Sequence, residues 1–312
     1  MAQEISLRET YGQTLVELGM ENPDIVALDA DLCRSTMTRF FALKFPERFF
    51  DCGVAEQNMV GIAAGLAASG KIPFASTFAV FAPGRCFDQI RMSIAQPQLN
   101  VKLVTTHGGI SVGEDGTSHQ SIEDLSLICS LPGFTVIVPA DAIETAQAVR
   151  VAAAHFGPFY IRLCRPKIPL VYAEDYRFNL GKAVTMRQGR DATIIAIGLM
   201  VKAALEAAQN LVRDGIYCRV LNMSTLKPID EEAIIKAAAE TGAIVTAEEH
   251  LEHGGLGSVV AQVVTSHQPV PMELVAIKDT YARSGKPDEL LERYGLTARD
   301  IERGVRSAIK RK

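Results

Sequence analysis

The sequence predicts an α/β protein made of two three-layer α/β/α domains with mainly parallel sheets. Short runs rich in Val and Ile alternate along the chain with Ala-rich stretches that have helical spacing. Because a strand that is buried on both faces reads as a continuous apolar run, this alternation favours parallel sheets covered by helices on both sides. With 312 residues, the chain is long enough for two domains that each bury a core.

The expected elements fall into two sets. In the first set we expect strands in IVALDAD from Ile25, VKLVTTH from Val101, FTVIVPA from Phe134 and PFYIRLC from Pro158. Helical spacing is present in residues 55–69, 85–95, 121–130 and 141–155. The second set has strands in ATIIAIG from Ala192, YCRVLNM from Tyr217 and AIVTAEE from Ala243.

Proline, tyrosine and charged residues replace the apolar periods between Pro166 and Arg190. Such a break is typical of a connection between domains. We therefore expect an N-terminal domain at 1–172, a linker at 173–190 and a C-terminal domain at 191–312.

Composition excludes several classes of protein. Hydrophobic residues make up 48% and charged residues 22%, the balance of a globular enzyme. The net charge of -4 and the lack of a large basic block argue against a nucleic-acid surface. Because no apolar stretch could cross a bilayer and the N-terminus lacks the pattern of a secretory signal, we expect a cytoplasmic protein without membrane contact. The six cysteines form no CxxC pair and are expected to be reduced core residues, not metal ligands.

The segment DCGVAEQN from Asp51 leads from a strand into a helix and places Glu56 in the first helical turn. A carboxylate there is favoured by the helix dipole, which is the simplest explanation for the residue. However, the following MVGIAAGLAASG is almost wholly apolar or small, so this helix is expected to be buried. Partial removal from water favours the protonated form of a carboxyl group, and Glu56 is therefore a candidate proton donor.

A glycine-rich loop follows the expected strand at Val101. It reads THGGISVGEDGTSHQ from Thr106 and contains His107, Glu114, Asp115 and His119. Turn formation explains the glycines. Two histidines and two acids at the carboxyl end of a parallel strand favour recognition of ligand hydroxyl groups and proton transfer. Their spacing matches no established metal signature.

Phenylalanines recur in STFAVFAPGRCFDQ from Ser76, at Phe78, Phe81 and Phe87. Spacing alone favours core positions. The same rings could instead form an apolar slot for a flat heterocycle.

Taken together, these segments resemble the transketolase family. The matching segments occur in the family's order and reach from the first ten residues almost to the last twenty: SLRETYGQ from Ser6, DADL from Asp29, GVAEQNMVGIAAGLA from Gly53, STFAVF from Ser76, FDQIRMS from Phe87, VGEDGTSHQ from Val112 and RSGKPDELLERYG from Arg283. Full-length members carry a further domain that binds the cofactor's diphosphate and a divalent metal through Gly-Asp-Gly and a downstream Asn. No Gly-Asp-Gly occurs in this chain.

The resemblance therefore implies the C-terminal half of a split transketolase, the second of the two chains of such an enzyme. This half would carry a pyrimidine-binding domain and a transketolase C-terminal domain, the latter supporting assembly rather than chemistry. Its partner would be the N-terminal-half, diphosphate-binding subunit, which would hold Mg²⁺ or Ca²⁺, and the complex would be an α2β2 heterotetramer. The pair would transfer a two-carbon ketol unit from a ketose phosphate to an aldose phosphate, in the pentose phosphate pathway or another branch of carbohydrate metabolism.

Roles for the cofactor site follow from the same resemblance. Glu56 would hydrogen-bond the pyrimidine ring nitrogen of thiamine diphosphate, so that the cofactor's own amino group can take the proton of the thiazolium carbon. Phe78 and Phe81 would stack on the pyrimidine, and Asp31 would face the thiazolium ring. The family often has a third aromatic residue three positions later, where this chain has Gly84.

The substrate would contact a second set of residues. His119 would lie near the reacting two-carbon fragment, and Asp115 would accept a hydrogen bond from a sugar hydroxyl. The sugar phosphate would be surrounded by Arg8, Ser35, His107 and Arg165, because the guanidinium group suits bidentate phosphate contacts.

Three alternatives stay open at this point. The beta subunit of a 2-oxo acid dehydrogenase has the same two-domain plan and also uses thiamine diphosphate, but the loop with two histidines favours sugar-phosphate transfer. Half of a deoxyxylulose-phosphate synthase is a weaker alternative, because that enzyme is normally one long chain. A non-catalytic assembly subunit is disfavoured by the intact Glu56, His107, Asp115 and His119.

Overall fold

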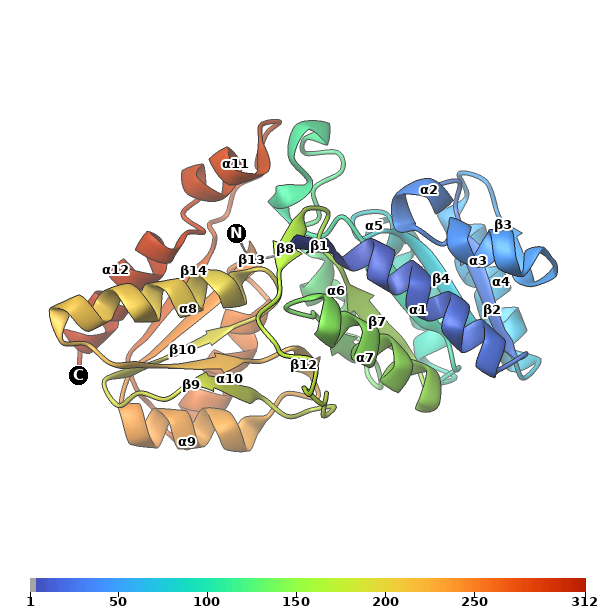
Figure 1. The fold of residues 1–312 in the computed structure, drawn as a ribbon. Helices are drawn as coiled ribbons and strands as arrows, with labels where there is room; N and C mark the ends of the chain where they lie inside the picture. Colours follow the sequence, from blue (N-terminus) through green and yellow to red (C-terminus); the bar gives the residue numbers. More distant parts are fainter. Residues whose placement is uncertain (1–3) are drawn as a thin grey trace.

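In the computed structural model, which describes residues 4–312, two α/β domains lie side by side (Figure 1). The first domain is built on a seven-stranded sheet with the order β12-β6-β7-β5-β4-β2-β3. Its strands are β2 (Ile25–Asp29), β3 (Phe49–Asp51), β4 (Ile72–Phe78), β5 (Lys102–Thr106), β6 (Thr135–Ile137), β7 (Phe159–Arg162) and β12 (Thr225–Lys227). All pairs are parallel except the one between β12 and β6.

The helices of the first domain lie on both faces of this sheet, as the fully buried strands β2 and β5 require. They are α1 (Leu7–Glu21), α2 (Cys33–Thr36), α3 (Arg39–Lys44), α4 (Glu56–Ala68), α5 (Ala82–Gln89), α6 (Asp124–Cys129) and α7 (Ala142–Ala154), with the short turns η1 (Pro46–Arg48), η2 (Ile90–Ala95) and η3 (Ile110–Asp115). The helix expected at 85–95 is therefore α5 continued by the π-helical η2.

The second domain has a five-stranded sheet with the order β14-β13-β10-β11-β9, in which only β9 is antiparallel to its neighbour. Its strands are β9 (Val184–Arg187), β10 (Ala192–Ala196), β11 (Cys218–Asn222), β13 (Ile244–Leu251) and β14 (Met272–Ile277). The helices are α8 (Met200–Leu211), α9 (Glu231–Thr241), α10 (Leu256–His267), α11 (Pro287–Arg293) and α12 (Ala298–Ile309), with the turn η4 (Val212–Asp214) after α8. The predicted fold class of two α/β domains is confirmed.

The domains are joined at more than one place. Strand β9 lies within the expected linker and pairs with β11, whereas β12 crosses over to extend the sheet of the first domain. One apolar core contains side chains of both domains, including Val136 and Val138 from the first and Leu221 and Leu226 from the second. Loops of the two domains can therefore form one surface with a fixed geometry.

A two-stranded antiparallel ribbon, β1 (Glu4–Ser6) with β8 (Lys167–Pro169), ties the start of the first domain to its end. Ser6 also caps α1, because its hydroxyl accepts the Glu9 N–H at 3.3 Å. The ribbon brings Arg8 and Arg165, which are 157 positions apart, into contact. Among residues 4–312, no helix is both long and apolar enough to span a membrane.

Candidate active site

Aromatic rings gather where two neighbouring parallel strands end. Phe78 is the last residue of β4 and lies opposite Thr106, the last residue of β5. Its ring stacks on Phe81 with a centroid distance of 5.6 Å and on His107 with a distance of 3.7 Å. Ligands of parallel sheets bind beyond such carboxyl ends. Phe78 is buried, as its spacing predicts for a core residue. Its ring nevertheless belongs to the aromatic cluster at the carboxyl ends of the strands, where a ligand can bind.

Glu56 lies beside this cluster, at the first position of α4, with 5% of its surface exposed. Its Oε1 accepts a hydrogen bond from Arg85 Nη1 at 2.6 Å. The guanidinium carbon of Arg85 lies 3.9 Å from the centroid of Phe81. Arg85 lies in the STFAVFAPGRCFDQ segment, but no sequence pattern marks it as a site residue.

The position of Arg85 tests whether these residues fit the expected cofactor. A guanidinium is a flat group with nitrogen donors, and here it is held against both the Glu56 carboxyl group and the face of Phe81. An aminopyrimidine is also flat and can lie against the same aromatic face, but its ring nitrogen accepts a hydrogen bond, so Glu56 has to carry a proton in order to donate to it. Glu56 and Phe81 therefore suit the pyrimidine end of thiamine diphosphate.

His119 is close to the same rings. Its centroid lies 5.4 Å from Phe81 and 6.0 Å from Phe78, edge-on to both. Its Nδ1 is 2.9 Å from Ser118 Oγ, which leaves Nε2 for a ligand. The structure thus brings His119, Phe78, Phe81 and His107 together, although the two histidines are 12 positions apart.

The cationic residues form a second group. Arg8 donates to the Ser35 carbonyl at 2.7 Å and to the Arg165 carbonyl at 3.3 Å. Arg165 in turn donates to the Val112 carbonyl at 2.6 Å and pairs with Glu114 at 3.2 Å. Two guanidinium groups therefore lie beside the glycine-rich loop, an arrangement suited to an anionic ligand.

His107 connects the aromatic and cationic groups. Burial lowers the pKa of its imidazole to about 3, and the charges of Arg8, Arg165 and His119 act in the same direction. Its Nδ1 is 2.8 Å from Thr106 Oγ1. At neutral pH His107 is therefore an uncharged imidazole, able to offer one nitrogen to a ligand without adding positive charge.

Asp31 and Asp115 are less tightly placed. Both are exposed, and neither carboxylate has a hydrogen bond or ion pair within the part of the chain that the structure describes. Asp31 has a positive φ of 62° and donates its backbone N–H to Asp51 at 3.0 Å. Below it, the buried Asp29 accepts hydrogen bonds from Thr36 and Thr38 and so shapes the loop that carries Asp31 and Ser35.

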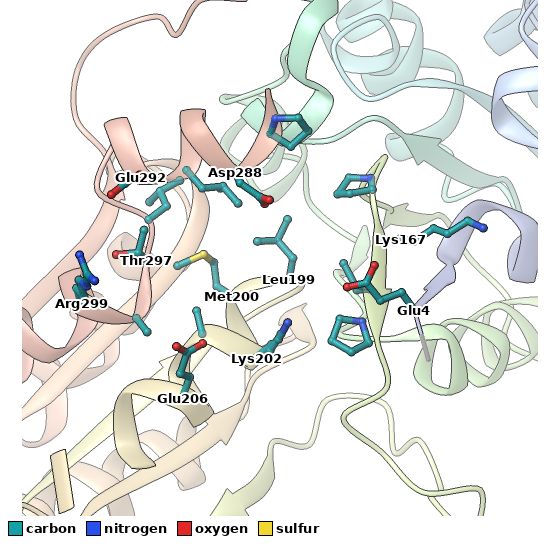
Figure 2. Close-up of a pocket in the computed structure, with 18 residues that line it drawn as sticks. Glu4, Lys167, Leu199, Met200, Lys202, Glu206, Asp288, Glu292, Thr297 and Arg299 are labelled. Atoms are coloured by element: carbon teal, nitrogen blue, oxygen red, sulfur yellow. The ribbon is translucent and has the colours of Figure 1, made fainter. Parts of the chain in front are cut away.

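The cavity between the two domains is separate from this cluster. It has a volume of about 470 Å³ and lies where Leu199 and Met200 face Asp288 and Glu292 (Figure 2). None of the predicted site residues lines it. Within residues 4–312, no group of three or more His, Cys, Asp or Glu side chains is arranged to hold a metal ion.

Comparison with known proteins identifies the family of both domains. The family model of the transketolase pyrimidine-binding domain matches residues 3–170, and that of the transketolase C-terminal domain matches residues 181–301. A putative transketolase C-terminal section from Methanocaldococcus jannaschii is 46% identical, over 98% of this chain and 96% of that protein. A 6-deoxy-6-sulfo-D-fructose transketolase subunit from Clostridium sp. (strain MSTE9) is 44% identical, over 98% of this chain and 95% of the relative.

A solved structure is similar over the whole chain. It is a split-gene transketolase in the form of an inactive tetramer of four beta chains, and it is 52% identical to this chain. The TM-score is 0.91, over 99% of this chain and 100% of the other. The predicted family resemblance is therefore confirmed.

Proposed function

Since the chain belongs to the transketolase family, we propose that it is the pyrimidine-binding subunit of a split transketolase and acts with a diphosphate-binding subunit. The observation that carries this proposal is the pair of surfaces presented by Glu56 and Phe81, which hold a planar nitrogen-rich group between them. The two-histidine loop beside them favours sugar transfer over 2-oxo acid oxidation.

Thiamine diphosphate, on which the family depends, supplies the electron sink for carbon–carbon cleavage when it is bound. In our proposal Glu56 donates a hydrogen bond to the pyrimidine ring nitrogen, and Phe78 and Phe81 fix the plane of that ring. In this proposal Arg85 would give up its contact with the Glu56 carboxyl group when the pyrimidine is held there, because both groups would use Glu56 and Phe81. Asp31 is proposed to face the thiazolium end.

The contacts with the substrate are proposed from the cationic residues beside the glycine-rich loop. Arg8 and Arg165 bind the sugar phosphate together with Ser35, and the neutral His107 adds a hydrogen bond without further charge. His119 lies edge-on to Phe81, which supports a role in transferring a proton to an oxygen of the two-carbon unit. Asp115 accepts a hydrogen bond from a sugar hydroxyl.

The setting of the reaction belongs to the same proposal. The partner subunit holds the diphosphate with Mg²⁺ or Ca²⁺, in an α2β2 assembly located in the cytoplasm. The substrates are a ketose phosphate donor and an aldose phosphate acceptor of the pentose phosphate pathway, or of a catabolic branch that uses another sugar phosphate. The relative named for 6-deoxy-6-sulfo-D-fructose makes such a branch worth testing, with sulfonated and phosphorylated sugars compared side by side.

A mixing experiment tests the proposal. The chain is used to isolate a co-purifying protein that contains Gly-Asp-Gly and a downstream Asn, and the two are assayed together and separately with thiamine diphosphate and magnesium. We expect ketol transfer from a ketose phosphate only in the mixture. Full activity of the chain alone would refute the need for a partner, and oxidative decarboxylation of a 2-oxo acid would refute the transketolase assignment.

A further inference from the structure

The loop that carries Asp115 and His119 is held by residues of the C-terminal domain. It follows β5 and contains η3 (Ile110–Asp115), and in Figure 1 it stands beside α11. Thr117 donates to the Ala282 carbonyl at 2.8 Å, and Gln120 donates to the Arg283 carbonyl at 3.1 Å. These bonds fix only the far end of the loop.

The base of the loop is fixed by Glu249, which lies near the end of β13. The two carboxylate oxygens of Glu249 accept hydrogen bonds from the Ser111 N–H and from Ser111 Oγ, the latter at 3.2 Å. A side chain at Gly109, which has φ +83°, would overlap this carboxyl group. The glycine and the glutamate therefore fit each other, and the fit determines the path of the backbone at the start of η3.

Burying the carboxyl group of Glu249 costs free energy, because the charged form loses its contact with water. This cost argues against an incidental contact. The Glu249 side chain is buried, and burial raises the pKa of its carboxyl group to about 7. Beneath it, Arg162 donates to the carbonyls of Glu249 and Ser121 at 3.0 Å each, which links β13 to the other end of the loop. The carboxylate of Asp124 forms an ion pair with Arg162 at 3.0 Å.

The neighbouring Glu248 provides a contrast within the same strand. It is equally buried, and its pKa is also raised to about 7, chiefly by burial. Its carboxylate accepts the N–H groups of Leu256 and Gly257 at 2.7 and 2.8 Å, at the start of α10. Glu248 therefore stabilises the C-terminal domain itself, whereas Glu249 reaches into the first domain.

We propose that Glu249 is a positioning residue of the transferase site: by holding Ser111 it sets the position of the loop that carries Asp115 and His119. This inference rests on the proposed function, because it assigns a purpose to the placement of those two side chains. It also gives the C-terminal domain a part in the chemistry, beyond the support of assembly expected from the family resemblance.

Two measurements on Glu249→Ala and the matched Glu248→Ala test the proposal. The first is hydrogen–deuterium exchange of the loop amides in the chain alone, which does not depend on any activity. The second is kcat for ketol transfer and the Kd of thiamine diphosphate in the complex with the diphosphate-binding subunit. Glu249→Ala should speed exchange across residues 107–120 and lower kcat roughly 10- to 100-fold, because a displacement of about 1 Å can have such an effect. The Kd of the cofactor should stay within about threefold, since Glu56, Phe78 and Phe81 lie outside the loop.

Glu248→Ala should lower thermal stability but leave the loop amides and kcat at wild-type values. Glu249→Gln should restore most of kcat, because its amide can still accept from the Ser111 N–H and donate to Ser111 Oγ. If Glu249→Ala does not fold, Ser111→Ala gives a milder test: it removes the hydroxyl contact and keeps the Ser111 N–H bond, so exchange and kcat should change several-fold. Unchanged loop exchange and kcat in Glu249→Ala, or in Ser111→Ala, would overturn the proposal. A wild-type complex without ketol transfer would instead refute the proposed function, whereas the exchange experiment would still report on the Glu249 contact.

Discussion

Replacing Glu56 by Gln should separate the chemistry of this side chain from its part in stability. The amide can still accept a hydrogen bond from Arg85, and Arg85 is 46% exposed. Ion pairs with an exposed partner contribute about 0.2 to 1 kcal/mol, so the free energy of unfolding should fall by about 1 kcal/mol at most. For a chain of this size, that corresponds to a decrease in Tm of roughly 2 °C or less.

Turnover should respond quite differently. An amide can donate a hydrogen bond to a ring nitrogen but cannot give up its proton, so the contribution of the acid is lost. Such contributions are typically about 10²- to 10⁴-fold, equivalent to roughly 3 to 5 kcal/mol in the activation barrier. The assay is kcat for ketol transfer in the assembled complex, with Tm measured by calorimetry on the same preparations.

Arg85→Ala is the control, because it removes the same ion pair and keeps the carboxyl group. It should reproduce the small decrease in Tm and keep kcat within about tenfold of wild type, since in our proposal Arg85 gives up its contact with Glu56 when the cofactor is bound. Near-normal turnover in Glu56→Gln would refute the reasoning. So would a loss of kcat in Arg85→Ala as large as that in Glu56→Gln.

Three further predictions concern the neighbouring charges. Arg165→Ala should raise KM roughly 10- to 100-fold for phosphorylated sugars, as expected for a charge-assisted hydrogen bond, with much less effect on unphosphorylated sugars; equal effects on both would remove its phosphate role. The imidazole of His107 should stay neutral in NMR titrations from pH 8 down to pH 5, and a midpoint near 6.5 would contradict its burial. Because its folded pKa of about 3 lies below the ordinary value near 6.5, the unfolded chain takes up the proton first, and the stability due to His107 should be lost as pH falls from about 6.5 towards 3. Arg162→Met should lower the free energy of unfolding by about 3 to 5 kcal/mol in urea titrations, because it leaves the buried Asp124 without its cation; a loss below 1 kcal/mol would show that the pair is dispensable.

The sequence was sufficient for the fold class because fully buried strands leave a plain apolar signature. It did not reveal β4, whose Ser76 and Thr77 break the apolar run. Ser76 is nevertheless buried, because its hydroxyl lies 2.8 Å from Tyr11 OH. Nor did it predict that β12 would pair with β6, since three residues that are about 90 positions from their partner carry no local pattern.

The candidate site also contains residues that the sequence predicts and contacts that it does not. Glu56, Phe78 and His119 could be singled out because each lies in a short motif where a strand ends. The contact between Arg85 and Glu56 joins residues 29 positions apart and depends on the conformation of a long side chain. The contact between Glu249 and Ser111 spans 138 positions and two domains. Such pairings arise from the tertiary arrangement, which the spacing of residue types does not encode.

A crystal structure of the two-subunit complex with thiamine diphosphate tests the central claim most directly. We expect the Glu56 carboxyl group within about 2.6 to 3.2 Å of the pyrimidine ring nitrogen, with the ring against Phe81 and Arg85 moved away from both. A structure in which Glu56 keeps its contact with Arg85 while the pyrimidine is bound elsewhere would contradict the account.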